Sequence, residues 1–431
     1  MNKKLTVEIL SFMLIATMLS FSACVKDRCK QEVTYTYYQP HYKTKSEVRE
    51  NIKSNSPRQM EATGKIYIRG NYIFLNEIDK GIHVINNSNP SRPENVAFID
   101  IPGNMDMAVK GNILYADLYT DLVTLDITDP MNVKVKKVIE GVFPHRYWGG
   151  GFAGPDVTSE LIVTEWEKRD TTVTASCDQT GWFWGGRADV FMSAASSNNP
   201  GTGGSAVPST SPIGAGGSMA RFTIMNERLY TVSWSDLDVF NISNATDPEH
   251  TNTINIGGWT IETIYPFKDK LFIGSRAGMY IYNVTNADVP APAGQFEHAR
   301  SCDPVIADDN YAYVTLRSGT ECEGFSNQLE IVNLKSNGDP VLEKTYPMKN
   351  PHGLSKDGNL LFICDGAAGL KLYDATNVLN LQLLNEVNDI ETFDVIALNN
   401  IALVVTKDGL YQYSYADLPG LRLLSKITIG K

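Results

Sequence analysis

The sequence lacks the motifs that mark most metal proteins and many enzymes. Its six cysteines include no Cys-x-x-Cys pair, and its six histidines stand singly, without metal-ligand spacing. The 431 residues contain no P-loop, no Gly-x-Ser-x-Gly and no His-Glu-x-x-His. We therefore expect no metal ion and no cofactor, and no motif names a reaction.

Positive charge is scarce as well. The chain has 38 Lys and Arg against 49 Asp and Glu, a formal net charge of −11. An acidic chain has no basic surface to bind a phosphate backbone. Nucleic acid is therefore not an expected partner.

Long apolar runs are confined to the start of the chain. The basic "MNKKL" is followed by "ILSFMLIATMLSF" and by the small residues "SA" before Cys24. This apolar run is short for a membrane span and is typical of a secretory signal, which we assign to residues 1–23. Because it ends at Cys24, it resembles a bacterial lipoprotein lipobox, although Phe21 replaces the usual Leu and Glu8 interrupts the apolar region. The alternative is an ordinary cleaved signal with an incidental cysteine.

The lipobox resemblance implies a lipid on Cys24 and attachment to a membrane. We expect a cell-envelope location, at the outer membrane, with the periplasmic and surface faces both open. Residues 24–63 are polar and predict a tether, in which "VTYTYY" (33–38) alternates like a strand and 43–59 has room for a short helix. Export would also place the remaining cysteines in an oxidising compartment.

One phrase recurs through the rest of the chain, an apolar alternation that ends at Asn or Asp and runs into a turn. It begins at residues 81, 121, 236, 278, 328, 369 and 409, with spacings of 40, 115, 42, 50, 41 and 40. Each unit of about 40 residues divides into four short strands, and no helical period is seen in 64–431. One four-stranded sheet cannot bury both faces, so the copies must pack around a ring.

These features predict an all-β protein, a seven-bladed β-propeller of four-stranded blades over residues 64–431. Gly81, Gly278, Gly369 and Gly409 suit the turn before the repeated strand. Side-chain bonds to the following turn are expected at the end of that strand. The residues concerned are Asn86, Asp126, Asn241, Asn283, Asn333 and Asp374.

The repeated strand, which reads "IHVIN", "LVTLD" and "LKLYD", resembles the LVIVD repeat. Members of that family are exported or cell-surface bacterial and archaeal proteins predicted to form β-propellers. The resemblance covers about residues 64–142 and 219–431. It implies little about activity, because the family has no established common function.

The wide spacing of 115 indicates an insertion between blades 2 and 3, at residues 143–218. Its part 193–218 is rich in Ser, Gly and Pro and predicts a flexible loop. The stretch 160–175 could form a hairpin, which leaves eight blades as the alternative. Four of the six tryptophans lie in 143–192. Exposed rings of this kind stack on sugars or anchor peptides, but they also suit a small core of the insertion itself. The candidate ligand-binding residues are Trp148, Trp166, Trp182, Trp184 and Arg187.

A second candidate site follows from aligning the first strand of each blade, which lines the central channel. The aligned side chains form a mixed polar ring at the channel mouth, able to bind a polar ligand or to run acid–base chemistry between His352 and an aspartate. The structural alternative is that they satisfy backbone groups and pair between blades. The ring comprises Lys65, Asp106, Arg221, Glu262, Asp303, His352 and Asp394.

The cysteines divide by position. Cys302 and Cys322 lie in one blade, at a strand start and in a long loop, and a disulfide between them is expected, with two unpaired thiols as the alternative. Cys364 ends the apolar strand "LLFIC" and predicts a buried thiol. Cys29 and Cys177 stay unassigned.

We predict a non-enzymatic, lipid-anchored propeller that binds a glycan or an envelope protein. The first alternative is an enzyme that acts on carbohydrate through the polar ring. The second is a passive structural spacer, which would bind no ligand.

Overall fold

The structure is a computed structural model, and it describes residues 30–143, 160–176, 215–257, 261–298, 304–318, 326–335 and 339–430. The chain divides into two compact units. The smaller comprises residues 1–40 and 166–196, and the larger comprises 41–165 and 197–431. Candidate residues that fall in the gaps are Cys24, Trp148, Trp182, Trp184, Arg187, Cys302, Asp303 and Cys322.

The smaller unit contains most of a two-stranded sheet. Its strands are β1 (Lys30–Thr44) and β11 (Leu161–Ser176), and within it the hydroxyls of Thr34 and Thr172 lie 2.8 Å apart. The alternating stretch 33–38 is therefore a strand. The hairpin expected over 160–175 is wrong, because β11 is continuous and lacks the Gly or Asn-Gly that a tight turn needs. Trp166 lies on this strand.

The larger unit is built from antiparallel meanders, whose strands we call A to D in chain order. The first sheet has six strands, in the order β12-β3-β4-β5-β6-β2. They are β12 (Ala215–Gly216), β3 (Ile66–Arg69), β4 (Tyr72–Glu77), β5 (Gly81–Asn86), β6 (Glu94–Asp100) and β2 (Lys53–Asn55). The second sheet comprises β7 (Met107–Lys110), β8 (Ile113–Leu118), β9 (Asp121–Asp126) and β10 (Lys134–Ile139).

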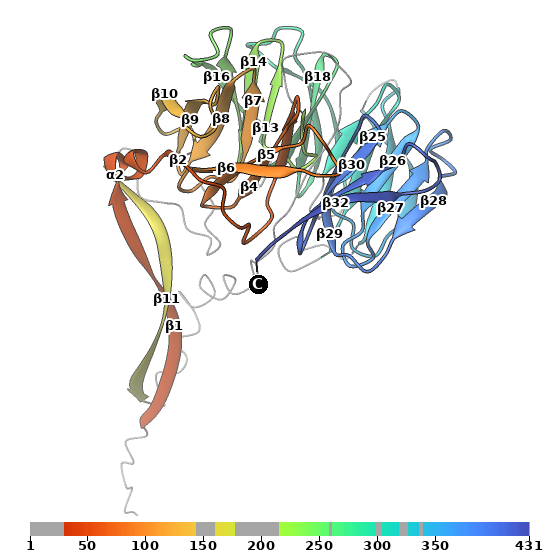
Figure 1. The fold of residues 1–431 in the computed structure, drawn as a ribbon. Helices are drawn as coiled ribbons and strands as arrows, with labels where there is room; N and C mark the ends of the chain where they lie inside the picture. The colour runs from red at the N-terminus through yellow and green to blue at the C-terminus, as the bar shows by residue number, and fades with distance from the viewer. Residues whose placement is uncertain are drawn as a thin grey trace, which may run out of the picture. The chain divides into compact units, whose positions relative to one another are not determined.

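Five more four-stranded sheets follow among the described residues. The third comprises β13 (Phe222–Met225), β14 (Arg228–Ser233), β15 (Asp236–Asn241) and β16 (Glu249–Asn255), and the fourth comprises β17 (Ile261–Phe267), β18 (Lys270–Ser275), β19 (Gly278–Asn283) and β20 (Ala291–Glu297). The fifth comprises β21 (Val305–Ala307), β22 (Tyr311–Leu316), β23 (Gln328–Asn333) and β24 (Val341–Pro347). The sixth comprises β25 (Leu354–Asp357), β26 (Leu360–Cys364), β27 (Leu370–Asp374) and β28 (Gln382–Val387), and the seventh comprises β29 (Thr392–Leu398), β30 (Ile401–Thr406), β31 (Gly409–Ser414) and β32 (Arg422–Thr428). Figure 1 shows these sheets succeeding one another along the chain, from orange to blue.

Local side-chain chemistry ends the C strands of the first six sheets as the sequence predicts. The terminal Asn or Asp accepts a hydrogen bond from the backbone N–H two residues later, which fixes the turn into strand D. At Asn86 this bond is 3.0 Å long and at Asp374 it is 2.8 Å. The same bond forms at Asp126, Asn241, Asn283 and Asn333.

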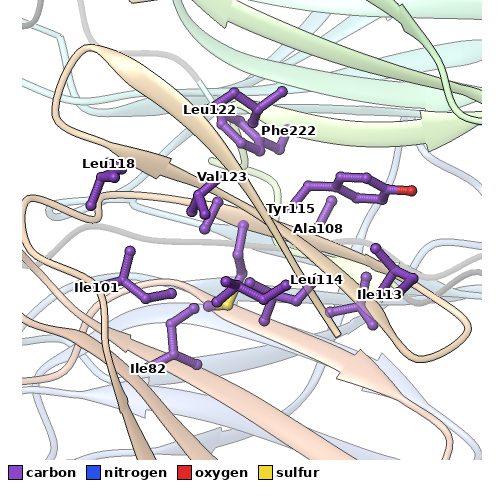
Figure 2. Close-up of a cluster of buried hydrophobic side chains, with 14 of the residues drawn as sticks. Ile82, Ile101, Ala108, Ile113, Leu114, Tyr115, Leu118, Leu122, Val123 and Phe222 are labelled. Carbon is purple, nitrogen blue, oxygen red and sulfur yellow. The ribbon is translucent and has the colours of Figure 1, made fainter. Parts of the chain in front are cut away.

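Neighbouring sheets bury one another's faces. The A strands contact each other from sheet to sheet, and Figure 2 shows Leu114 and Val123 of the second sheet between Ile82 of the first and Phe222 of the third. The seventh sheet packs on the first, where the buried Thr63 hydroxyl donates to the carbonyl of Thr406 at 2.8 Å. This all-β architecture is a β-propeller.

The larger unit begins before residue 64, the boundary expected from the sequence. Strand β2 pairs with the outer strand β6 of the first sheet, and Met60 is 2% exposed in the core shared with the seventh. Ahead of it, the short helix α2 (Lys45–Glu50) carries a capping box at Thr44 and buries Val48. Within the described residues no helix has the length and apolar character needed to cross a membrane.

Candidate functional site

A cavity of about 120 Å³ lies where three successive sheets present their strand A starts and B–C turns. We call it the mouth cavity. Its lining comes from the second, third and fourth sheets and contains Asp106, Arg221 and Glu262 of the predicted ring. The lining used below also includes Asp117, Tyr119, Phe143, Ser233, Trp234 and Arg276.

Asp106 lines the cavity and bonds to groups from three sheets. It is 3% exposed and precedes β7 directly. Its carboxylate accepts the ammonium of Lys65 at 2.8 Å, the backbone N–H of Met107 at 2.7 Å and the backbone N–H of Arg221. One side chain therefore joins the A strands of the first three sheets and brings Lys65, Asp106 and Arg221 together.

Asp117, at the end of β8, holds the backbone that carries Asp106. One of its oxygens accepts the N–H groups of Met105 at 2.8 Å and Asp106 at 2.9 Å, and the side-chain amide of Asn104 at 2.8 Å. Asp365 of the sixth sheet acts in the same way toward the backbone of Lys349 and Asn350. These carboxylates satisfy backbone groups that would otherwise be buried without partners.

Lys65 pairs with Asp106 but does not itself line the cavity. Burial lowers its pKa, and the neighbouring Asp106 carboxylate opposes that effect. Its side chain is 11% exposed, so the ammonium depends on Asp106 for the bonds that it has lost to water. A pair of this kind holds its geometry tightly, because separating it leaves a charge in a poorly solvated site.

Two arginines line the cavity, and their side chains differ in their partners. Arg276 donates from Nε to Glu262 at 3.0 Å, a pair within the fourth sheet. The guanidinium of Arg221 has no hydrogen bond or ion pair to another residue in the part of the chain that the structure describes. Its backbone is fixed, because its N–H donates to Asp106 and its carbonyl accepts from Val232 at 2.9 Å.

Two aromatic residues at the cavity have unusual backbone conformations. Tyr119 and Trp234 each open a B–C turn with φ of 57° and 44°. A bulky residue in the left-handed region is a conformational outlier, and such outliers gather at functional sites. The Tyr119 ring lies against Gly103, where an added Cβ would come within 2.5 Å of the ring. Across the cavity lining, Phe143 and Phe222 stack with ring centroids 5.5 Å apart.

The returning end of the insertion crosses the space between the A strands. Residues 215–216 pair with β3 of the first sheet. The carbonyl of Ala220 then accepts from Ile264 of the fourth sheet at 2.8 Å, and the buried Ser218 hydroxyl accepts from the N–H of Leu354 in the sixth at 3.3 Å. Residues 215–220 therefore occupy the centre of the ring and lead directly into Arg221. The flexible loop expected over 193–218 does not extend through these last residues.

His352 and Asp394 do not line the mouth cavity. His352 is 3% exposed, and burial, with a smaller effect of Arg317, puts its pKa well below the usual range. Asp394 is fully buried, and burial raises its pKa well above the usual range against the opposing effect of Lys65. Neither oxygen of Asp394 has a hydrogen-bond partner by distance and angle among the described residues. Burial thus favours the neutral form of both groups, and neither lines the cavity.

The remaining candidates stand as follows. Cys364 is fully buried and unpaired, as its strand pattern predicts, and burial raises its pKa. The expected disulfide, the lipid site and four of the five candidate ligand-binding residues of the insertion lie outside the described residues. In the described ranges, no group of His, Cys, Asp or Glu is arranged to hold a metal ion.

Three residues of the cavity lining lie outside the alignment of strand A. Each opens a B–C turn at the equivalent place, two residues before strand C; they are Tyr119, Trp234 and Arg276. Aligning that position would have found all three. The pairing of Arg276 with Glu262 needs both alignments together.

Comparisons with known proteins agree with this architecture. The model of the LVIVD repeat matches residues 62–99 and 103–138, which confirms the resemblance seen in the repeated strand. The computationally designed Ika8 protein is similar in structure, with a TM-score of 0.51 and 9% identity over 88% of this chain and 91% of that one. A protein from Lactobacillus plantarum has a TM-score of 0.50 and 12% identity over 85% and 96% of the two chains. At these identities the likeness concerns the fold alone. No curated protein matches the chain.

Proposed function

We propose that this member of the LVIVD-repeat family is an exported, lipid-anchored binding module whose mouth cavity holds the end of a glycan. Cys24 would carry the lipid at the cell envelope, at the outer membrane. The propeller would then present the cavity to its ligand.

The observation that carries the proposal is the lining of the cavity. Aromatic rings at Tyr119 and Trp234 stand beside the polar groups of Ser233, Glu262 and Arg276. Sugars are recognised by this combination, in which a ring stacks on the sugar face while polar groups bind its hydroxyls. The two strained turns support a binding role. If Tyr119 and Trp234 served only the fold, glycine would adopt the same positive φ at a lower conformational cost.

The size of the cavity limits the ligand. At about 120 Å³ it is well below the roughly 300–1,000 Å³ of pockets for drug-sized molecules. It therefore suits one sugar unit at the end of a chain. Residues 215–220 occupy the centre of the ring, so a ligand would reach the cavity from the side of the B–C turns.

The test is a glycan binding screen with the full chain in detergent, run beside Trp234→Gly. Glycine removes the ring and is compatible with the left-handed backbone, so the melting temperature should not fall. The control is Tyr42→Ala, since Tyr42 is 51% exposed and lies away from the cavity lining. We expect binding by the wild type and the control, and at least tenfold weaker binding by Trp234→Gly.

Other results would redirect the proposal. Unchanged binding in Trp234→Gly but loss in Trp182→Ala/Trp184→Ala would place the site on the insertion. No glycan bound by the wild type would contradict a glycan ligand and favour an envelope protein, to be sought by cross-linking, or a spacer. Turnover of a bound glycan that is lost in His352→Ala/Asp394→Asn would favour the enzyme.

A further inference from the structure

Arg221 is the cation at the mouth cavity whose side chain has no partner among the described residues. Lys65 is paired with Asp106 at 2.8 Å, and Arg276 with Glu262 at 3.0 Å. Asp117 is satisfied by backbone N–H groups and by the amide of Asn104. Only the guanidinium of Arg221 is left, within the described residues, without an acceptor.

The backbone of Arg221 is also fixed in place. Its backbone N–H and carbonyl are both bonded, and the preceding residue, Ala220, is tied to Ile264 of the neighbouring sheet. The fixed backbone sets where the side chain begins, and the planar fork of the guanidinium matches the two oxygens of a carboxylate.

The surrounding carboxylates argue for a ligand with a single negative charge. Asp106, Asp117 and Glu262 all line the cavity. One carboxylate can pair with the guanidinium of Arg221, whereas a doubly charged phosphate would add a second negative charge facing these three acids. The neighbouring Tyr119 and Trp234 supply ring faces for a sugar.

We infer that the mouth cavity selects a sugar unit that carries a carboxylate, a uronic acid at a glycan end, and that Arg221 binds its carboxylate. This inference rests on the proposed function and makes it more specific. Arg221 is then the specificity residue, while the rings and the Arg276–Glu262 pair contact the rest of the sugar.

The test is calorimetric titration of the full chain in detergent with glucuronic acid, galacturonic acid, their uncharged amides, the parent neutral sugars and glucose 6-phosphate. A hydrogen-bonded charge pair predicts that the acid binds about ten- to a hundredfold tighter than its amide. Arg221→Gln should abolish this preference, and Arg221→Lys should keep part of it. Arg422→Gln, at an exposed position on β32, is the matched control and should leave it unchanged.

The outcomes separate the two proposals. Equal binding of acid and amide, tighter binding of the phosphate, or an acid preference that survives in Arg221→Gln would each overturn the role given to Arg221, while a glycan site would stand. Failure of the wild type to bind any sugar, here and in the glycan screen, would overturn both. Melting temperatures of the Gln and Lys variants, compared with the control, separate lost binding from lost folding.

Discussion

Replacing Asp106 by alanine should strongly destabilise the larger unit, because it removes one acceptor from three donors. Asp106→Ala leaves the Lys65 ammonium, which is 11% exposed, without its only ion-pair partner in the described structure. It also frees the backbone N–H groups of Met107 and Arg221. The pair is nearly buried, so solvent screens it little.

The magnitude follows from the cost of an unpaired buried charge. Breaking a buried pair by removing one partner costs about 3–5 kcal/mol. Replacing both partners by apolar residues of similar volume is often close to neutral. Lys65→Met/Asp106→Leu should therefore be more stable than Asp106→Ala, even though it removes more polar atoms.

The assay is urea unfolding of the single and double variants, fitted for midpoint and slope at pH 7 and pH 10. Burial lowers the pKa of Lys65 in the folded state, and loss of Asp106 removes the main opposing effect. A base with a lowered folded pKa loses stability as the pH falls through that pKa and regains it above the unfolded value. The gap between wild type and Asp106→Ala should thus be smaller at pH 10.

The result that would refute this reasoning is a loss below about 1 kcal/mol for Asp106→Ala, the range of an exposed pair. Additive effects of Lys65→Met and Asp106→Leu in the double variant would refute it equally, since contacting residues in one network should couple by about 0.5–3 kcal/mol. Either outcome would mean that water reaches the ammonium in the folded protein.

Two further predictions concern the sixth and seventh sheets. Burial raises the folded pKa of Asp394, so wild-type stability should fall as the pH rises through that pKa. Asp394→Asn cannot ionise, so it should gain about 1–3 kcal/mol of stability relative to wild type between pH 5 and pH 8. Urea midpoints of wild type and variant that run parallel over this pH range would contradict the prediction. Gly369→Ala places a Cβ within 1.9 Å of the Val387 carbonyl oxygen, at a backbone φ of 82°. It should lower the melting temperature much more than the control Gly358→Ala, where φ is 57° but nothing lies near the added Cβ. Equal losses of melting temperature in the two variants would show that a small shift relieves the contact.

Most of the fold could be predicted from the sequence, because the strands and turns of each propeller repeat depend on residues close together along the chain. Asn86 and Asp374 bond to their own turns, so the ends of these C strands follow from neighbours in sequence. The pairing of β11 with β1 could not be read in this way, since the strands lie more than a hundred residues apart. An alternating strand shows that it needs a partner but does not say which one.

The candidate site was predicted in part. Alignment of strand A selected Lys65, Asp106 and Arg221, and the structure places them together because equivalent positions in adjacent blades are neighbours. It could not separate them from His352 and Asp394, which the same alignment selects but which lie buried away from the cavity. Burial depends on what fills the space between the sheets, and residues 215–220 fill part of it.

The sequence by itself determined the repeated unit, its strand order and its turns, because each rests on contacts between residues close along the chain. Tertiary structure alone decided which charges find partners. Lys65 and Arg221 occupy equivalent positions and carry the same charge, yet only Lys65 donates its side chain to Asp106. That difference arises from three strands meeting around one carboxylate, and it leaves the guanidinium of Arg221 without a partner among the described residues.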